Sequence, residues 1–175
     1  MKKAIILLSV VAVFASCTKL LDQLTTFTFT RDAEFTLPAS STLGVPISLN
    51  STDVETSYES EFANNNTNTE NVESIKITAL SLQVTKPAGA DFNFLKSIEL
   101  SISADGLADK VIASKNDIQN ENVQQLNLDV TAEDLKPYLT KDKFSLKISA
   151  VTDEVLTQDY EMKTSSTFEV KGKVK

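Results

Sequence analysis

Apolar and polar residues alternate with a period of two along most of the chain after residue 24. From Thr25 to Leu37, threonines and charged residues separate a series of apolar positions: Phe27, Phe29, Ala33, Phe35 and Leu37. A two-residue period predicts a β-strand that buries one face. The same alternation predicts strands in four further segments, at residues 45–49, 98–104, 126–130 and 144–150. A final long strand or a hairpin is indicated by Tyr160, Met162, Phe168, Val170 and Val174.

Two features modify this strand pattern. Pro46 lies inside the segment 45–49, and because proline cannot donate to a sheet ladder, we expect an edge strand or a bulge there. Between residues 75 and 84 the apolar positions change from odd to even numbers, at Ala79 and Leu80. A slip of one residue would turn all later side chains to the opposite face, so the change predicts a β-bulge. The alternative is a strand that is buried on both faces at this point.

Two short helices are expected between the strands. In the first, Val54, Tyr58 and Phe62 recur every four residues, and Ser51 or Thr52 is the expected N-cap. The polar stretch "NNNTNTEN" that follows, at residues 64–71, is expected to be an exposed loop because it has nothing to bury.

The second helix is predicted within residues 131–139, where Thr131 and Asp134 have the spacing of a capping box. Pro137 would limit it to about a turn and a half. Its apolar residues would then plug one end of the core: Leu135, Tyr138 and Leu139. Eight or nine strands with two short helices predict an all-β fold, an antiparallel β-sandwich of immunoglobulin-like or jelly-roll type.

The first 17 residues differ from the strand-forming chain. Two lysines precede an apolar segment of 11 residues, 4–14, that carries no charge. This is the pattern of a secretory signal peptide. It is too short to span a bilayer, which needs roughly 20 apolar residues. Small side chains then lead through Ser16 directly to Cys17, the single cysteine of the chain.

The order "FASC" at residues 14–17 resembles the lipobox of bacterial lipoproteins, and its "SC" ending is similar to the signals of small lipoproteins of the Bacteroidota type. The resemblance implies cleavage between Ser16 and Cys17, followed by acylation of the Cys17 thiol and of the new amino group. It divides the chain into a signal peptide (1–16), a lipidated cysteine with a short tether (17–24) and a single β-sandwich domain (25–175). The alternative is an ordinary secreted protein with a cysteine in its leader.

This resemblance also implies a location. Each buried methylene of a lipid anchor contributes about 0.8 kcal/mol, and two or more chains hold a protein stably on a membrane. In lipoproteins of this type, an acidic cluster directly after the cysteine goes with export to the cell surface. Residues 18–22, "TKLLD", lack such a cluster. We therefore expect an anchor in the outer membrane and a domain that faces the periplasm, with exposure at the cell surface as the alternative.

Charge and cysteine content limit the partners and the sources of stability. Removal of residues 1–16 leaves 15 basic and 24 acidic residues, a net charge of −9. Such a surface repels phosphate backbones, which argues against a nucleic-acid partner. One cysteine permits no intramolecular disulfide, so the apolar core must stabilise the domain.

Few residues indicate catalysis or a cofactor. The chain has no histidine, which excludes Ser-His-Asp and Cys-His catalysis and His-ligated zinc. Its four glycines are scattered and form no phosphate-binding loop. Among the 24 acidic residues, nothing singles out two as a glycosidase pair. We therefore expect neither an enzyme nor a bound cofactor.

Two ligand classes stay open as alternatives. Calcium could use acidic loops, although Asp-Gly is first of all a turn signal; the candidate oxygens belong to Asp105 and Asp109 around Gly106, and to Asn116, Asp117, Asn120 and Glu121. A glycan usually stacks on exposed aromatic rings, but tryptophan is absent and the three tyrosines fit apolar faces: Tyr58, Tyr138 and Tyr160. The favoured prediction is a membrane-anchored, non-catalytic domain that binds a protein partner in the cell envelope. The alternative is a ligand-binding module for glycan or calcium.

Overall fold

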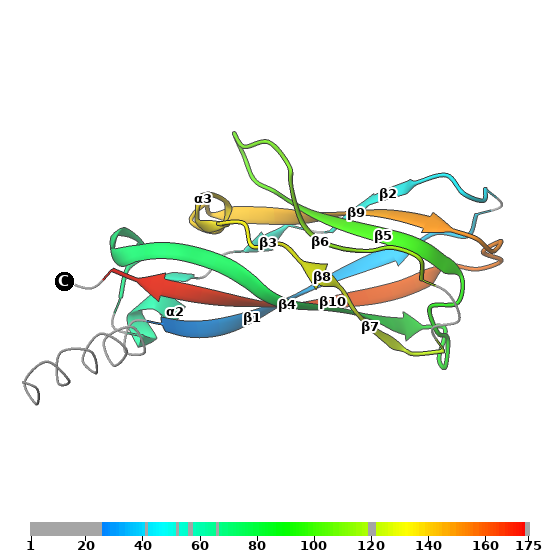
Figure 1. Ribbon diagram of the computed structural model, residues 1–175, viewed down its shortest axis with the longest axis horizontal. Coiled ribbons are helices and arrows are strands. Elements are labelled where there is room, and N and C mark those ends of the chain that lie inside the picture. The colour runs from blue at the N-terminus through cyan, green and yellow to red at the C-terminus, as the bar shows by residue number, and fades with distance from the viewer. Residues whose placement is uncertain are drawn as a thin grey trace, which may run out of the picture.

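The computed structural model describes residues 26–40, 42–51, 53–55, 58–65, 67–118 and 122–173. Within them, two antiparallel sheets face each other (Figure 1). Sheet 1 has the strand order β1 (Thr26–Leu37), β10 (Tyr160–Gly172), β4 (Val72–Lys86) and β7 (Gln125–Asn127). Sheet 2 has the order β2 (Ile47–Asn50), β9 (Lys143–Thr152), β5 (Leu95–Ser103), β6 (Lys110–Lys115) and β8 (Asp129–Val130). The predicted all-β antiparallel sandwich is confirmed.

The core lies between the sheets and follows the alternation of the strands. In β1, the even-numbered residues from Thr28 to Thr36 are exposed, whereas Phe29 and Phe35 are buried. Phe29 lies opposite Phe168 of β10, and the two rings stack with centroids 5.3 Å apart. The largest fully buried side chains come from both sheets and from the connections between them: Phe62, Phe92, Phe144 and Phe168.

The change of phase in the fourth strand is a β-bulge, as predicted. The register between β10 and β4 shifts between Thr167 and Phe168, whose partners are Ala79 and Ile77, so Thr78 is the extra residue. Thr78 and Ala79 are both exposed, which makes the alternative of burial on both faces wrong. The bulge keeps Ile77 and Leu80 on the core side although they are an odd number of positions, three, apart.

Two further predictions about strands are settled by the sheet order. β2 begins directly after Pro46 and pairs with β9 alone, so this segment is an edge strand as expected. The C-terminal segment is one long strand, β10, rather than a hairpin. Val174 lies outside the described residues.

The segment 126–130 also forms a strand, but it is shared between the two layers. β7 pairs with β4 of sheet 1, and β8 pairs with β6 of sheet 2. Between them, the N–H of Leu128 donates to the carbonyl of Leu80 over 2.9 Å. One continuous stretch of backbone thus joins the two sheets.

The first predicted helix is shorter than expected. Helix α2 spans Tyr58–Asn64, whereas Val54–Glu55 form the short strand β3, which pairs with β9. Ser51 is not an N-cap: its hydroxyl accepts the N–H of Leu146 over 2.9 Å, and its own N–H donates to the Leu146 carbonyl. These bonds extend the pairing of the chain with β9 past the end of β2, which competes with helix formation. Thr52 lies outside the described residues.

The polar stretch at 64–71 is only partly a loop. A single turn of 3-10 helix, η1, spans Thr69–Asn71, and the side chain of Asn68 caps it by accepting the N–H of Asn71. Asn68 and the first two residues of η1 are exposed, which agrees with the expected position at the surface.

The second helix, α3, spans Lys136–Leu139. The predicted capping box is wrong, because Thr131 bonds strand β6 through Ile112 and Val111. Asp134 instead accepts the N–H of Lys136 over 3.1 Å and that of Ile75 over 3.0 Å. The expected plug is present, since its three apolar side chains are all buried: Leu135, Tyr138 and Leu139.

Candidate functional site

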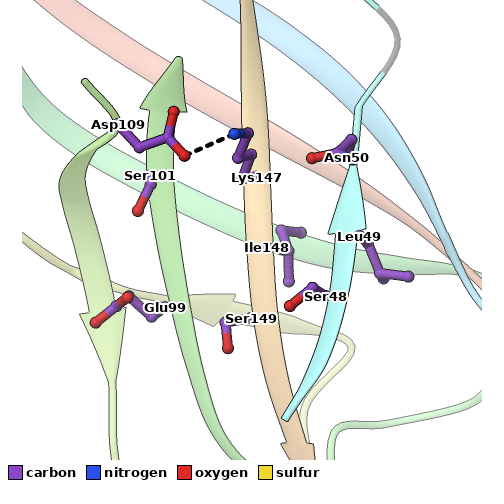
Figure 2. A pocket seen from close by; sticks show the side chains of 9 residues that line it. All are labelled: Ser48, Leu49, Asn50, Glu99, Ser101, Asp109, Lys147, Ile148 and Ser149. Atoms are coloured by element: carbon purple, nitrogen blue, oxygen red, sulfur yellow. Dashed lines mark hydrogen bonds and ion pairs between the residues drawn. The ribbon is translucent and has the colours of Figure 1, made fainter. Parts of the chain in front are cut away.

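A shallow polar groove crosses the outer face of sheet 2. It is open to solvent, has a volume of about 110 Å³ and is lined by nine residues: Ser48, Leu49, Asn50, Glu99, Ser101, Asp109, Lys147, Ile148 and Ser149 (Figure 2). The strand register sets these side chains in rows. Ser149 lies opposite Ser48 on one side and Glu99 on the other. Short serine side chains between longer charged ones leave the surface hollow.

An ion pair closes one end of the groove. The ammonium of Lys147 lies 2.6 Å from a carboxylate oxygen of Asp109. Hydrogen bonds from Lys147 and Ser103 lower the pKa of the Asp109 carboxyl below its usual value. Asp109 is therefore ionised at neutral pH and holds no proton that it could donate to a substrate. The groove has the chemistry to hydrogen-bond a small polar molecule.

The structure does not bring together those candidate calcium residues that it describes. Asp105 and Gly106 form the turn after β5, in which Gly106 has φ +74° and Leu107 N–H donates to the Ala104 carbonyl. Asp117 lies beyond the other end of β6, about 20 Å away for six extended residues. Asp109 already has the Lys147 ammonium as its counter-ion.

Four of the predicted site residues lie outside the described residues: Ser16, Cys17, Asn120 and Glu121. Within those that are described, no group of three or more His, Cys, Asp or Glu side chains could hold a metal ion. No helix in the same part of the chain has the length and apolar character needed to cross a membrane.

The tyrosines were expected in the core, and two of them are buried there, Tyr58 and Tyr138. Tyr160 is half-buried, with its ring centroid 4.3 Å from that of Phe94. Burial raises the pKa of the Tyr58 hydroxyl. Neither buried ring is available to stack on a sugar.

The sheet edges are a second candidate surface, of which the sequence pattern identified only the edge at β2. Among the described residues, four of the five edge strands are short: β2, β3, β7 and β8 have four, two, three and two residues. The fifth, β1, has 12 residues and pairs with β10 alone. Only the strand order reveals this, because β1 and its partner lie at opposite ends of the chain.

Comparison with protein-family models gave no match, and none of the curated proteins matches either. Solved structures with a similar arrangement are distant. The acidic stable capsid structure of Helicobacter pylori bacteriophage KHP30 matches with a TM-score of 0.39 and 5% identity over 82% of this chain and 91% of that chain. The family 32 carbohydrate-binding module of C. perfringens NanJ, in complex with galactose, matches with a TM-score of 0.35 and 10% identity over 83% and 96%. These similarities are too weak to bring a function to this chain.

Proposed function

We propose that the chain is a cell-envelope lipoprotein, anchored through Cys17 in the outer membrane and facing the periplasm, whose β-sandwich is a non-catalytic domain that binds a protein partner. The observation that carries the proposal is the place of Cys17. It follows a signal-type apolar segment after two small residues and precedes the first described strand by nine residues.

The arrangement of the strands supports tethering at one end of the domain. Thr26 pairs with Lys171, so the start of β1 lies beside the end of β10 (Figure 1). Nine residues reach at most about 30 Å, at roughly 3.4 Å each. The end with Thr26 would therefore stay close to the bilayer. The connections at the other end of the sandwich would point away from it.

The chemistry of the surface supports a binding role rather than catalysis. In the groove on sheet 2, Lys147 and Asp109 neutralise each other's charge in an ion pair. Its other polar groups include serine hydroxyls from three strands, with no neighbouring histidine to activate them.

Substitution of Cys17 by serine tests the anchor. We expect the wild-type chain to incorporate a clickable palmitate analogue and to sediment with membranes, and Cys17→Ser to do neither. Thr18→Ala, next to the cysteine, is the matched control and should behave as wild type. Unchanged fractionation of Cys17→Ser would contradict the proposal.

Crosslinking on native membranes tests the partner. A tagged wild-type chain should capture one protein in stoichiometric amount, and Cys17→Ser should lose it because the two proteins no longer share a surface. If the wild-type chain is anchored and captures nothing, the protein-binding role is wrong.

The groove favours a second candidate function, the binding of a small polar ligand such as a sugar. Hydroxyl, amide and carboxylate groups are what a sugar needs for hydrogen bonding. A ligand that binds only the folded chain raises its melting temperature. We would add monosaccharides, disaccharides or calcium to the purified lipoprotein in detergent, with Lys147→Ala as the variant that should lose any sugar response.

A further inference from the structure

Among the described residues, the long edge of sheet 1 is less protected than the other three edges. Natural edge strands are blunted by shortness, proline, charged side chains or bulges. β1, with the sequence TFTFTRDAEFTL, contains no proline, glycine or lysine, and its charged residues are Arg31, Asp32 and Glu34. Its 12 pairs with β10 run without a register shift. By contrast, the pairing of β10 with β4 on the other side shifts three times.

Side-chain hydrogen bonds show which main-chain groups of β1 face away from β10. Thr78 and Thr85 of β4 donate to the carbonyls of Thr167 and Glu161, so the odd-numbered residues of β10 turn toward β4. The even-numbered residues of β10 then turn toward β1. One of them, Thr164, donates its hydroxyl to the carbonyl of its partner Ala33.

Because even residues of β10 pair with odd residues of β1, the odd residues of β1 are bonded to β10 and the even ones face outward. The outward set comprises Thr28, Thr30, Asp32, Glu34 and Thr36. One outward main-chain group is already hydrogen-bonded, because the Arg31 guanidinium donates to the Thr30 carbonyl over 2.9 Å. The strand past Arg31 therefore offers an evenly spaced row of donors and acceptors.

Charge along this row indicates what kind of strand fits it. Lys163 of β10 lies opposite Glu34, but its ammonium bonds the diagonal Asp32 over 2.6 Å. Two carboxylates thus share one ammonium, and Glu34 forms no ion pair with any described residue. A strand laid against β1 with a lysine or arginine beside Glu34 would supply the missing cation.

We propose that an extended segment of the partner protein pairs with the outward main-chain groups of β1, adding a strand to sheet 1 with a basic side chain beside Glu34. This rests on the protein-binding role proposed above. Main-chain hydrogen bonds would supply the affinity of such an added strand, and the contact with Glu34 would help to set its register.

Substitutions at residue 34 separate the main-chain contribution from the charge. Glu34→Pro removes an outward N–H and blocks an added strand, but it removes no bond to β10. Glu34→Thr removes the charge and keeps the N–H. In the membrane crosslinking assay, we expect Glu34→Pro to lower partner recovery by about tenfold or more, equivalent to about 1.4 kcal/mol. Glu34→Thr should lower recovery about two- to fivefold.

Thermal unfolding of both variants is the folding control. A variant that keeps its unfolding transition is folded, so its recovery of the partner can be compared with that of the other variant. If Glu34→Pro recovers as much partner as Glu34→Thr, strand addition is wrong. Should Glu34→Pro fail to fold, the crosslinking and exchange measurements that follow decide the question without it.

A photoreactive residue maps the contact. Benzoylphenylalanine at Thr36, on β1, should form an adduct with the partner, and the same residue at Gln125, on the opposite edge of sheet 1, should not. An adduct at Gln125 alone would overturn the proposal. An adduct between two copies of this chain would identify a homodimer edge and overturn it as well.

Hydrogen exchange gives the signature of pairing. In the free chain, the amides of Asp32, Glu34 and Thr36 should exchange quickly, and in the purified complex they should slow by about tenfold or more. A complex in which these amides stay fast has its interface elsewhere. If the wild-type chain captures no partner at all, the protein-binding function fails first, which is a different result.

Discussion

The edge strands β1 and β2 belong to the same sandwich but are terminated differently. β2 is four residues long, follows Pro46 and passes at its end to Ser51, whose side chain takes the N–H of Leu146 from β9. β1 keeps regular pairing over 12 residues, and one of its outward main-chain groups, the Thr30 carbonyl, accepts a side-chain hydrogen bond from Arg31. β1 contributes Phe29, Ala33, Phe35 and Leu37 to the buried core, whereas Ile47 and Leu49 of β2 are only partly buried, so the strand that the core needs more is the one with the longer open edge. Protection of an edge is a separate property of the sequence.

The largest expected effect tests the alternation along β1. Ala33→Pro should cost about 2–4 kcal/mol of unfolding free energy, because it removes a bond to β10 and leaves a buried carbonyl unpaired. Thr36→Pro, which faces outward, should stay within about 1 kcal/mol of wild type. Urea unfolding followed by circular dichroism measures both. Equal losses of unfolding free energy in the two variants would mean that the outward residues are wrongly assigned. That result would also contradict the strand-addition proposal.

The second-largest expected effect concerns the hydrogen bond that Ser51 makes at the end of β2. Ser51→Ala should cost about 1–2 kcal/mol, because the Leu146 N–H loses its acceptor in a buried position. Ser48→Ala, at an exposed position of β2, is the matched control and should change stability by less than about 0.5 kcal/mol. Similar values for the two variants would show that the side chain of Ser51 does not fasten this edge.

The smallest effect concerns the ion pair beside the open edge. A hydrogen bond from Lys163 lowers the pKa of Asp32 below its ordinary value of 3.8. The folded state therefore binds this proton less readily than the unfolded state. The resulting stability is fully present above pH 3.8 and is lost as the pH falls through the folded-state pKa.

Asp32→Asn removes that contribution. Since the Asp32 side chain is 45% exposed, solvent screening limits the loss at pH 7 to less than about 0.5 kcal/mol. Unfolding curves between pH 7 and pH 2 should converge for variant and wild type at the acid end, and 1 M salt should reduce the difference at pH 7. A gap that widens with acid would contradict the assignment.

Much of the fold could be predicted from the sequence because strand burial has a period of two. The edge position after Pro46 and the bulge at Thr78 followed from the same pattern. Strand β6 was missed because Ile112 and Ala113 are consecutive and both buried, so no alternation marks it. The predicted first helix is longer than α2 because apolar residues spaced four apart lie on one face of a strand as well as on one face of a helix. Val54 lies in β3, whereas Tyr58 lies in α2.

The candidate surfaces were less predictable. Ser48, Glu99 and Ser149 meet in the groove only because of the order and register of three strands, which local patterns do not encode. The open edge of β1 depends on where the chain places its other strands. Cys17 is the opposite case, since its signal is entirely local, and it stays a prediction.

The antiparallel pairing of the two terminal strands determines how the domain responds to tension. Force applied through Cys17 enters β1 at Thr26, beside Lys171. If the load is held at the far end of the sandwich, β1 is pulled along its own axis, and its ladder bonds, perpendicular to that axis, bear the force together in shear. If the two chain ends are pulled apart instead, the same bonds break one pair at a time. A tether at the N-terminal side thus places this β-sandwich in its mechanically stronger direction.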